Sequence, residues 1–458
     1  MTAIAAEMPA SPSREELSWR LCTTYGMGTI AVSILLNTVT TYFPALMSTV
    51  LGQTPALAGL LLTFSKLYDI VVDLVVGDRI DRVAARMKRR RRYMLVGAGI
   101  SAVSFFLLFS PPVTNGPWLV IGIAAILMLY STGYSLFTVP YIAIAPDIAR
   151  SYDGRTKLMS FRTFFGAVGQ MVALAGAAAL VRLGDGGAEG YRIMGGVLAL
   201  AILFAQLAAY VGTAGVADDP GQRPPERHGI VESAQQIWRN KPAMLLVAAK
   251  TLQYISLACN ISTGLLFKLN VLKIGYEGQI QLSVAQNLAM GLCMPLWLAA
   301  GRRYGKRKCY LAAIALYGLT MLSWLAADSS ITEAGLIVRG VLQGVGAGGM
   351  ILMSLAMLPD VMEHDFTLNN TRRDGIYSSI YAIIEKAGFA IGAAVMGVYL
   401  SYAGYAATTK GKLVEQSDSA VTALYAGNAV IPALLLAASF VIMCFYSLDR
   451  AKVEAVGR

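Results

Sequence analysis

Two carboxylates, Asp69 and Asp73, lie four residues apart in the apolar segment SKLYDIVVDLVVGDRI. In a helix this spacing places both side chains on one face, about 6 Å apart. Two like charges at that distance in an apolar setting need a neutralising partner, which a sodium ion, a proton or a lysine ammonium would each supply. Lys386 stands in the middle of another apolar segment, IYAIIEKAGFAIG, and is the natural internal counter-ion. The three residues predict either a cation site or a static structural salt bridge.

A second group of polar side chains belongs to an apolar segment that prolines interrupt. The stretch YSTGYSLFTVPYIAIAPD contains Tyr134, Ser135 and Thr138 and is broken by Pro140 and Pro146. Broken, hydroxyl-rich helices at membrane depth usually line a cavity, and aromatic faces with nearby hydroxyls suit sugar rings. Tyrosine is also common at the membrane interface, so a binding pocket and an aromatic belt both fit this stretch.

Polar residues of other apolar segments extend the set of candidates. Asn37, Gln253 and Tyr381 are polar enough to line the same cavity, although each would equally serve as a contact between helices. A charge inside the membrane costs roughly 3 kcal/mol on insertion scales, so it normally faces a partner or a watery cavity. The other intramembrane charges of this kind include Lys66, Arg162, Lys250, Arg339, Asp360 and Glu385.

The composition is that of a membrane protein. The chain has 458 residues, of which 56% are hydrophobic and 14% charged, whereas a soluble domain carries about 25% charged residues. So much apolar side chain cannot be hidden inside soluble domains and must face lipid. Two histidines and five cysteines show no metal-binding or redox spacing, which argues against zinc, haem, iron-sulfur and disulfide scaffolds. Transport requires no bound cofactor, so none is expected.

Apolar runs long enough to cross a bilayer predict an all-α integral membrane protein. A hydrocarbon core of about 30 Å needs roughly 20 apolar residues per helix. Runs of this kind occur twelve times, at 22–48, 56–78, 93–111, 118–146, 158–181, 192–214, 242–267, 280–300, 309–327, 333–359, 375–403 and 420–447. The first twenty residues lack the pattern of a cleaved signal peptide, so the first span is expected to be retained.

The basic residues indicate an orientation. With the N-terminus in the cytoplasm, 27 of the 38 lysines and arginines fall in cytoplasmic segments and 6 in external ones, as the positive-inside rule requires. The densest clusters lie at 79–92 and 302–308, after the second and the eighth span. Topology and lipid headgroups explain these clusters, so a nucleic-acid partner is not needed.

The chain also divides into two halves. The polar, proline-rich stretch 215–241 is typical of a cytoplasmic linker and separates residues 1–214 from residues 242–458. The two basic loops fall at matching places in the halves, which indicates an internal repeat. We therefore expect twelve transmembrane helices in two six-helix bundles, which is the layout of the major facilitator fold.

The loop after the second span, GDRIDR, contains Asp78 and Asp81. Charge pairing with the neighbouring arginines at a helix end explains both residues. The loop also resembles the degenerate G-x-x-x-D-R signature that follows the second span of facilitator proteins, where it helps to latch the inward side. By that resemblance the two residues are expected to act in gating.

Four stretches of the chain share a pattern with one known family. They are YGMG in the first span, LYDIVVDLVVGDRIDR in the second, DGRTKLMSFRTFFG entering the fifth, and MLPDVMEHDF through YAIIEKAGFAIGA at spans ten and eleven. Together with the span pattern they resemble the glycoside-pentoside-hexuronide:cation symporter family, the melibiose-permease branch of the major facilitator superfamily. The resemblance implies that Asp69 and Asp73 hold the coupling cation, with Ser135 as a hydroxyl ligand and Lys386 linked to the site. It further implies roles at the sugar pocket and inner gate for Tyr134, Arg162, Arg372 and Asp374.

The sequence departs from the family pattern at three positions. Val72 stands where melibiose permease has an asparagine before the second carboxylate, which removes a neutral oxygen ligand for sodium. Sodium needs several oxygens and a proton needs one carboxylate, so we expect proton coupling, with sodium at Asp69 and Asp73 as the alternative. Ser33 and Thr138 replace the two carboxylates that grip galactoside hydroxyls, which argues against melibiose as the substrate.

These observations predict a secondary active transporter in a bacterial plasma membrane, and not an enzyme. We expect cation-coupled symport of a sugar or glycoside by alternating access, in which two bundles rock around a central site. The expected partners are membrane lipid and a small molecule of the glycoside, pentoside or uronide class, and the chain is expected to function as a monomer. A carrier of lysolipids or other amphipathic molecules is the alternative with the same fold. A receptor or membrane enzyme is disfavoured, because we find no sizeable soluble domain and no nucleophile paired with a base.

Overall fold

The computed structural model describes residues 18–82, 87–114, 116–149, 152–214, 240–369, 374–408 and 413–448, which are almost entirely helical. The helices of the first half are α1 (Trp19–Thr49), α2 (Pro55–Arg82), α3 (Met87–Phe109), α4 (Pro117–Ala143), α5 (Ala145–Ile148), α6 (Tyr152–Met171), the π-helical turn η1 (Val172–Gly176), α7 (Ala177–Arg182) and α8 (Ala188–Gly212). Those of the second half are α10 (Lys241–Asn270), α11 (Gly275–Tyr304), α12 (Lys306–Leu322), η2 (Ser323–Ala326), α13 (Glu333–Asn369), α14 (Asp374–Tyr402), α15 (Asp418–Tyr425), η3 (Ala426–Val430) and α16 (Ile431–Cys444).

Eleven helices within the described ranges are long and apolar enough to cross a membrane. They correspond to eleven of the twelve expected spans, with α6 to α7 and α15 to α16 each forming one continuous span. The helix outside this set is α2, whose 28 residues include Lys66, Asp69 and Asp73. The all-α membrane fold is thus confirmed, and the helix that carries the paired carboxylates is the one that the apolar criterion omits.

Several helices run past the apolar limits. The tenth span was expected to end at residue 359, but α13 continues to Asn369. The seventh was expected to end at residue 267, but α10 continues to Asn270 and includes Lys268. The apolar run measures only the thickness of the hydrocarbon, whereas backbone hydrogen bonds extend a helix further. Of the two breaks expected in the fourth span, the one at Pro146 is present, because α4 ends at Ala143 and Pro146 lies in the first turn of the short helix α5. The break expected at Pro140 is wrong, because Pro140 lies inside α4, which continues for three more residues.

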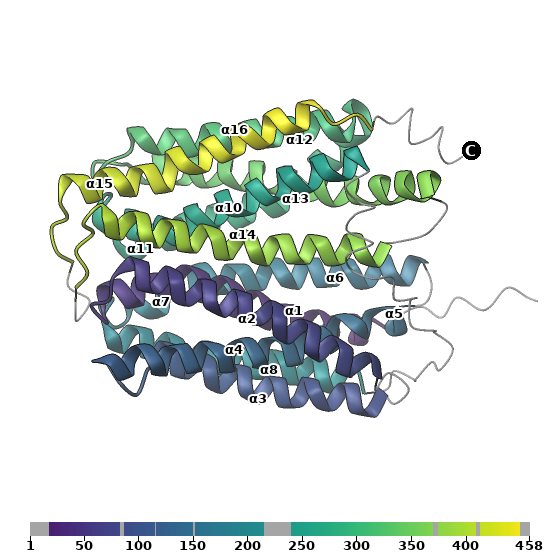
Figure 1. Ribbon diagram of the computed structural model, residues 1–458, viewed down its shortest axis with the longest axis horizontal. Helices are drawn as coiled ribbons and strands as arrows, with labels where there is room; N and C mark the ends of the chain where they lie inside the picture. The colour runs from purple at the N-terminus through teal and green to yellow at the C-terminus, as the bar shows by residue number, and fades with distance from the viewer. Residues whose placement is uncertain are drawn as a thin grey trace, which may run out of the picture.

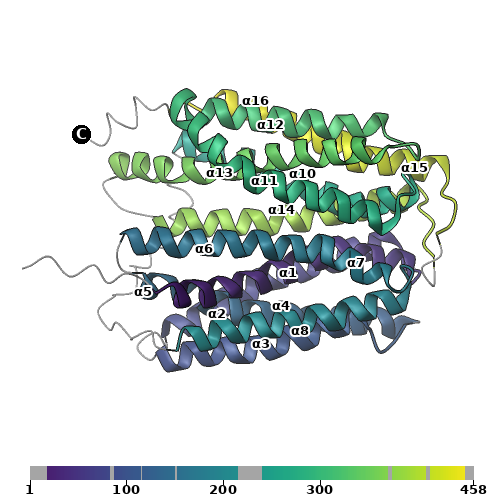
Figure 2. The ribbon, with the colours of Figure 1, turned by 180° about the vertical axis from the view of Figure 1, so that it is seen from behind.

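The helices form two groups that follow the order of the chain (Figures 1 and 2). In the first group α1 packs on α6 and α8, α3 packs on α4 and α8, and α2 packs on α4. In the second group α10 packs on α14 and α16, α12 packs on α13 and α16, and α11 packs on α13. The expected linker at 215–241 lies outside the described residues, apart from its last two positions.

The main seam between the groups joins α2 to α14. Glycines allow the two backbones to approach closely, because a Cβ atom added at Gly59 would lie 2.4 Å from the carbonyl oxygen of Ala393. A Cβ atom at Gly397 would lie equally close, 2.4 Å, to the carbonyl oxygen of Pro55. Small residues are the usual way in which membrane helices pack tightly. Asp69 lies ten residues beyond Gly59, or about 15 Å further along the helix.

The outer surface is apolar, as a lipid-facing surface must be. Large hydrophobic side chains such as Leu200, Phe204, Leu292 and Leu296 are strongly exposed. A soluble protein would expose few such side chains over contiguous helices. The surface therefore agrees with the membrane assignment made from composition.

Candidate transport site

The candidate site lies where α2 meets α4 on one side and α14 on the other. Two side-chain contacts set the register of α2 against α4: the hydroxyls of Ser65 and Ser131 are 3.0 Å apart, and those of Tyr68 and Thr132 are 3.2 Å apart. One helical turn beyond Ser131 lies Ser135, and one turn beyond Ser65 lies Asp69. The same register therefore brings the serine hydroxyl to the carboxylates.

Ser135 and Lys386 bridge the two carboxylates. The Ser135 hydroxyl lies 2.9 Å from Oδ1 of Asp69 and 2.5 Å from Oδ1 of Asp73. The Lys386 Nζ atom lies 2.8 Å from Oδ2 of Asp69 and also donates to Oδ2 of Asp73. The ammonium of α14 thus occupies the position between two like charges that a coupling cation would take.

Asp69, Asp73 and Lys386, here called the triad, differ in how far their side chains are exposed. The side chain of Asp69 is 3% exposed, that of Lys386 is 19% exposed and that of Asp73 is 33% exposed. Asp73 is therefore the carboxylate that water or an incoming cation can reach, while Asp69 lies behind it. A static salt bridge needs no such access, so the exposure of Asp73 favours an exchangeable site.

The triad opens into a cavity of about 200 Å³. The cavity is lined by residues of α1, α2, α4 and α14: Leu36, Lys66, Asp69, Asp73, Tyr134, Thr138, Ile142, Ala382, Glu385, Lys386 and Phe389. The ring of Tyr134 lies 6.0 Å from Lys386 Nζ, within reach of a cation–π contact. Four of the predicted residues, Asp69, Asp73, Tyr134 and Thr138, thus line one cavity with Lys386.

Two further charges of the cavity, Lys66 and Glu385, had no assigned role in the sequence analysis. Lys66 is 8% exposed. Glu385 accepts a hydrogen bond of 3.3 Å from the Tyr254 hydroxyl, and Lys250 Nζ lies 4.7 Å from the centre of the Tyr254 ring. Three carboxylates and three ammonium groups therefore come together from α2, α10 and α14. The carboxylates are those of Asp69, Asp73 and Glu385, and the ammonium groups are those of Lys66, Lys250 and Lys386.

A second cavity, of about 120 Å³, lies beside the first. Phe389 lines both cavities, and the adjacent residues Leu36 and Asn37 of α1 line the first and the second respectively. The predicted binding residue Asn37 therefore lies in this second cavity, where it also donates a hydrogen bond of 2.9 Å to the carbonyl of Ser33. Lys268 lines the second cavity too, although the sequence analysis placed it in an external loop.

The remaining predicted binding residues line neither cavity. Gln253 donates to the Ser439 hydroxyl at 3.0 Å and accepts from the Tyr310 hydroxyl at 2.8 Å, which is the contact between helices that was the alternative for it. Tyr381 is buried in the apolar core of the second group. Ser33 and Arg162 lie partly buried on α1 and α6.

The expected gating residues lie at the ends of α2 and α14 or in the segment before α14. Arg372 and the side chains of Asp78, Asp81 and Asp374 lie outside the described residues. Their expected role therefore stays a prediction.

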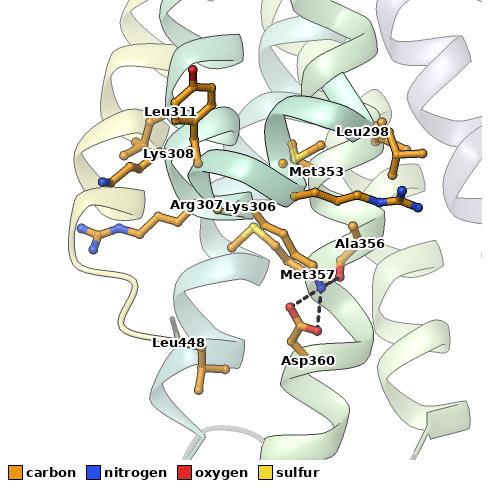
Figure 3. A pocket seen from close by; sticks show the side chains of 15 residues that line it. Leu298, Lys306, Arg307, Lys308, Leu311, Met353, Ala356, Met357, Asp360 and Leu448 are labelled. Carbon is orange, nitrogen blue, oxygen red and sulfur yellow. Dashed lines mark hydrogen bonds and ion pairs between the residues drawn. The ribbon is translucent and has the colours of Figure 1, made fainter. Parts of the chain in front are cut away.

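A larger cavity, of about 870 Å³, lies elsewhere, where the end of α11 and the start of α12 meet residues 352–360 of α13 (Figure 3). In Figure 3 the Lys306 side chain points toward Asp360, with Nζ 2.6 Å from Oδ2 of that carboxylate. Nζ also donates to the carbonyl of Ala356 at 2.9 Å. This cavity shares no lining residue with the carboxylate cavity, and it contains the basic loop 302–308 that was assigned to topology.

The opposite end of the molecule carries polar contacts between the two groups. The hydroxyls of Tyr191 and Tyr276 are 3.0 Å apart, and Arg182 forms an ion pair of 3.3 Å with Glu277. The Thr408 amide donates to the carbonyl of Ser48 at 2.7 Å. The groups are therefore joined both at this end and, through the triad, near the middle of α2 and α14.

In the part of the chain that the structure describes, eleven apolar helices in two groups, with paired charges buried at their seam, define a polytopic membrane transporter. The sequence profile described as MFS/sugar transport protein matches residues 24–450. The chain belongs to this family, and within it to the glycoside-pentoside-hexuronide symporters of the major facilitator superfamily, as the resemblance indicated. Its relatives are transporters, so the prediction that the chain is not an enzyme is confirmed.

Curated relatives and a solved structure cover almost the whole chain. The isoprimeverose transporter of Lactiplantibacillus pentosus is 23% identical over 97% of this chain and 92% of its own length. A putative 2,3-dihydroxypropane-1-sulfonate exporter of Escherichia coli is 25% identical over 98% of this chain and 96% of its own length. The crystal structure of the nucleoside transporter NupG superposes with a TM-score of 0.66 at 14% identity, covering 93% of this chain and 100% of that one, and shows the shared fold.

Proposed function

We propose that the chain is a proton-coupled symporter of a sugar or glycoside in a bacterial plasma membrane. The observation that carries the proposal is the bridging of Asp69 and Asp73 by Lys386, because the bridge links the two helix groups at a carboxylate that the cavity exposes. The relatives named as putative glycoside/cation symporter and as isoprimeverose transporter support this substrate class.

The architecture belonging to this proposal counts α2 as the twelfth span. Residues 1–214 and 242–458 then form two six-helix bundles joined by the linker 215–241, and both termini lie in the cytoplasm. The chain would work as a monomer in membrane lipid, without a bound cofactor.

Coupling follows from competition for the carboxylates. With both ionised, Lys386 holds α14 against α2 and favours one set of conformations. A proton on Asp73 removes one charge that Lys386 binds, weakens the link between the groups and, once substrate is bound, allows the groups to rock. The cation thereby biases an element with two stable arrangements.

A proton suits the ligands better than sodium. The oxygen atoms at the triad come from three side chains, those of Asp69, Asp73 and Ser135. Val72 supplies no oxygen next to Asp73, whereas sodium needs several oxygen ligands. Asp73 needs only to accept one proton.

The test is uptake of labelled glycosides, pentosides and uronides into proteoliposomes, under a proton gradient and separately under a sodium gradient. Asp73→Asn should abolish accumulation driven by the gradient while leaving exchange partly intact. The reason is that asparagine is always uncharged and can neither take up nor release the coupling proton. The matched control is Asp185→Asn, an exposed loop residue outside the spans. Unchanged accumulation by the Asp73 variant would refute the proposed coupling site.

A further inference from the structure

We propose that Lys268 binds an anionic group of the substrate, a carboxylate or a sulfonate, in the second cavity. The inference rests on the proposed function, because it assigns the charge of the molecule that is transported. It starts from an ammonium group that the protein itself does not neutralise.

Lys268 is 9% exposed and has no ion pair or hydrogen bond from its ammonium group within the described residues. Its surroundings are not acidic, since the residues that line the second cavity include no aspartate or glutamate. Burying a cation without a partner is unfavourable unless a counter-charge joins it. A bound anion is the partner that this cavity can admit.

The side chain is turned into the protein rather than toward the membrane surface. Lys268 is close to the end of α10, where a lysine ordinarily reaches outward to water. Here its Nζ lies 3.5 Å from the position that a Cβ atom of Gly264 would occupy, one turn back along the helix. The same position is 3.4 Å from Oδ1 of Asn428, which also lines the second cavity.

Neighbouring groups add donors and a second positive charge. The indole N–H of Trp324, a residue that lines the cavity, has no hydrogen-bond partner within the described residues. Arg339 lies over the Trp324 ring, 5.4 Å from its centre, and its Nη atoms donate to the carbonyls of Gly335 and Ser323. Neither cation has a carboxylate among these contacts, and Lys268 is the charged residue among those that line the cavity.

The size and position of the cavity agree with an anionic group at one end of a larger polar molecule. Its volume of about 120 Å³ is below the roughly 300–1,000 Å³ of pockets that enclose a whole drug-sized ligand. Phe389 is its common wall with the carboxylate cavity, where Tyr134 and Thr138 face the remaining space. A substrate whose anionic end meets Lys268 would extend its neutral part toward the coupling site.

Charge balance links the two sites. Lys66, Lys250 and Lys386 offset the carboxylates Asp69, Asp73 and Glu385, so a coupling proton leaves one extra positive charge. Lys268 adds a further positive charge in the second cavity, and one negative charge on the substrate offsets it. Symport of one proton with such an anion moves no net charge across the membrane.

The experiment measures binding without any gradient, on the full chain in detergent, with matched pairs of probes. One pair is methyl β-D-glucuronide and methyl β-D-glucoside, and the other is 2,3-dihydroxypropane-1-sulfonate and glycerol. In at least one pair the charged member should bind wild-type protein at least tenfold more tightly than the neutral member. The arm that responds distinguishes carboxylate from sulfonate.

Variants locate the effect at Lys268. Lys268→Gln should weaken binding of the charged probe by roughly tenfold to a hundredfold, the usual size of one charge-assisted hydrogen bond. Lys268→Arg should retain most of the affinity. Lys273→Gln is the matched control, because Lys273 is exposed in the loop after α10. Lys268→Gln removes an unpaired buried charge, so its unfolding temperature should rise rather than fall. The same measurement serves as the control that the variant is folded.

The outcomes separate this inference from the proposed coupling. Equal binding of both members in each pair, no binding of any probe, or full affinity in Lys268→Gln would overturn the anion site. Proton-driven uptake of the neutral glycoside alone would also overturn it, while leaving the proposed symport intact. Tight binding of the charged probe with no accumulation under either gradient would support the anion site and refute the symport.

Discussion

Removing the Lys386 ammonium tests whether the buried triad holds the two helix groups together. Lys386→Met keeps the length of the side chain but leaves Asp69 and Asp73 facing each other. Asp69 is 3% exposed, so its charge cannot be solvated by water when the ammonium is gone. Breaking a buried pair by removing one partner costs about 3–5 kcal/mol, and Asp73, which is 33% exposed, should contribute the smaller share.

Neutralising the carboxylates as well should remove the loss of stability that Lys386→Met causes. The variant Asp69→Asn/Asp73→Asn/Lys386→Met contains no buried charge at the triad, and replacing a whole buried ion cluster by neutral groups is often close to neutral in stability. The triple variant should therefore recover most of the stability that Lys386→Met loses. Lys273→Met provides the matched control at an exposed lysine.

The assay is thermal unfolding of the detergent-purified protein, followed by intrinsic fluorescence at one fixed heating rate, because large membrane proteins often unfold irreversibly. Lys386→Met should lower the apparent unfolding temperature by several degrees, and the triple variant should return it close to the wild-type value. A Lys386→Met protein as stable as wild type, or a triple variant no more stable than the single one, would refute the assignment of the link between α2 and α14 to this triad.

Two further predictions concern the same seam. Val72→Asn places an amide oxygen next to Asp73, so uptake into proteoliposomes should gain a response to a sodium gradient that wild type lacks; absence of that response would show that Val72 does not determine the ion. Gly59→Ala should destabilise the protein by about 1–3 kcal/mol, the usual cost of overpacking, because its Cβ would lie 2.4 Å from the Ala393 carbonyl oxygen. Gly99→Ala, where a Cβ meets nothing within 4 Å, is the control in the same unfolding assay, and equal stability of the two variants would contradict the close approach of α2 to α14.

The sequence predicted those features that depend on polarity along one helix. The spacing of Asp69 and Asp73 puts both on one face, and the contacts with Ser135 agree with that face. Apolar runs located eleven spans, because lipid imposes one length and one composition on every crossing helix. The pairing with Lys386 was also predictable, since a cation that deep has few partners to choose from.

Features that depend on how helices face one another were harder to predict. Gln253 and Asn37 are both amides in apolar spans, yet one is bonded between helices and the other lines a cavity. The rotation of each helix about its axis decides between these roles, and polarity alone does not determine that rotation. Lys268 was missed for a related reason, because counting residues to the end of an apolar run assigns a terminal lysine to the loop.

The position of Phe389 connects the coupling site to substrate recognition. This ring belongs to α14, one turn beyond Lys386 and Glu385, and it lines both cavities. A movement of α14 that accompanies release of Lys386 from Asp73 must therefore also change the wall of the cavity that contains Lys268. The linkage is reciprocal. If a cation on Asp73 changes the affinity for substrate by some factor, bound substrate changes the affinity of Asp73 for its cation by the same factor. Coupling by this route needs no direct contact between the proton and the substrate, only one helix that bears on both sites.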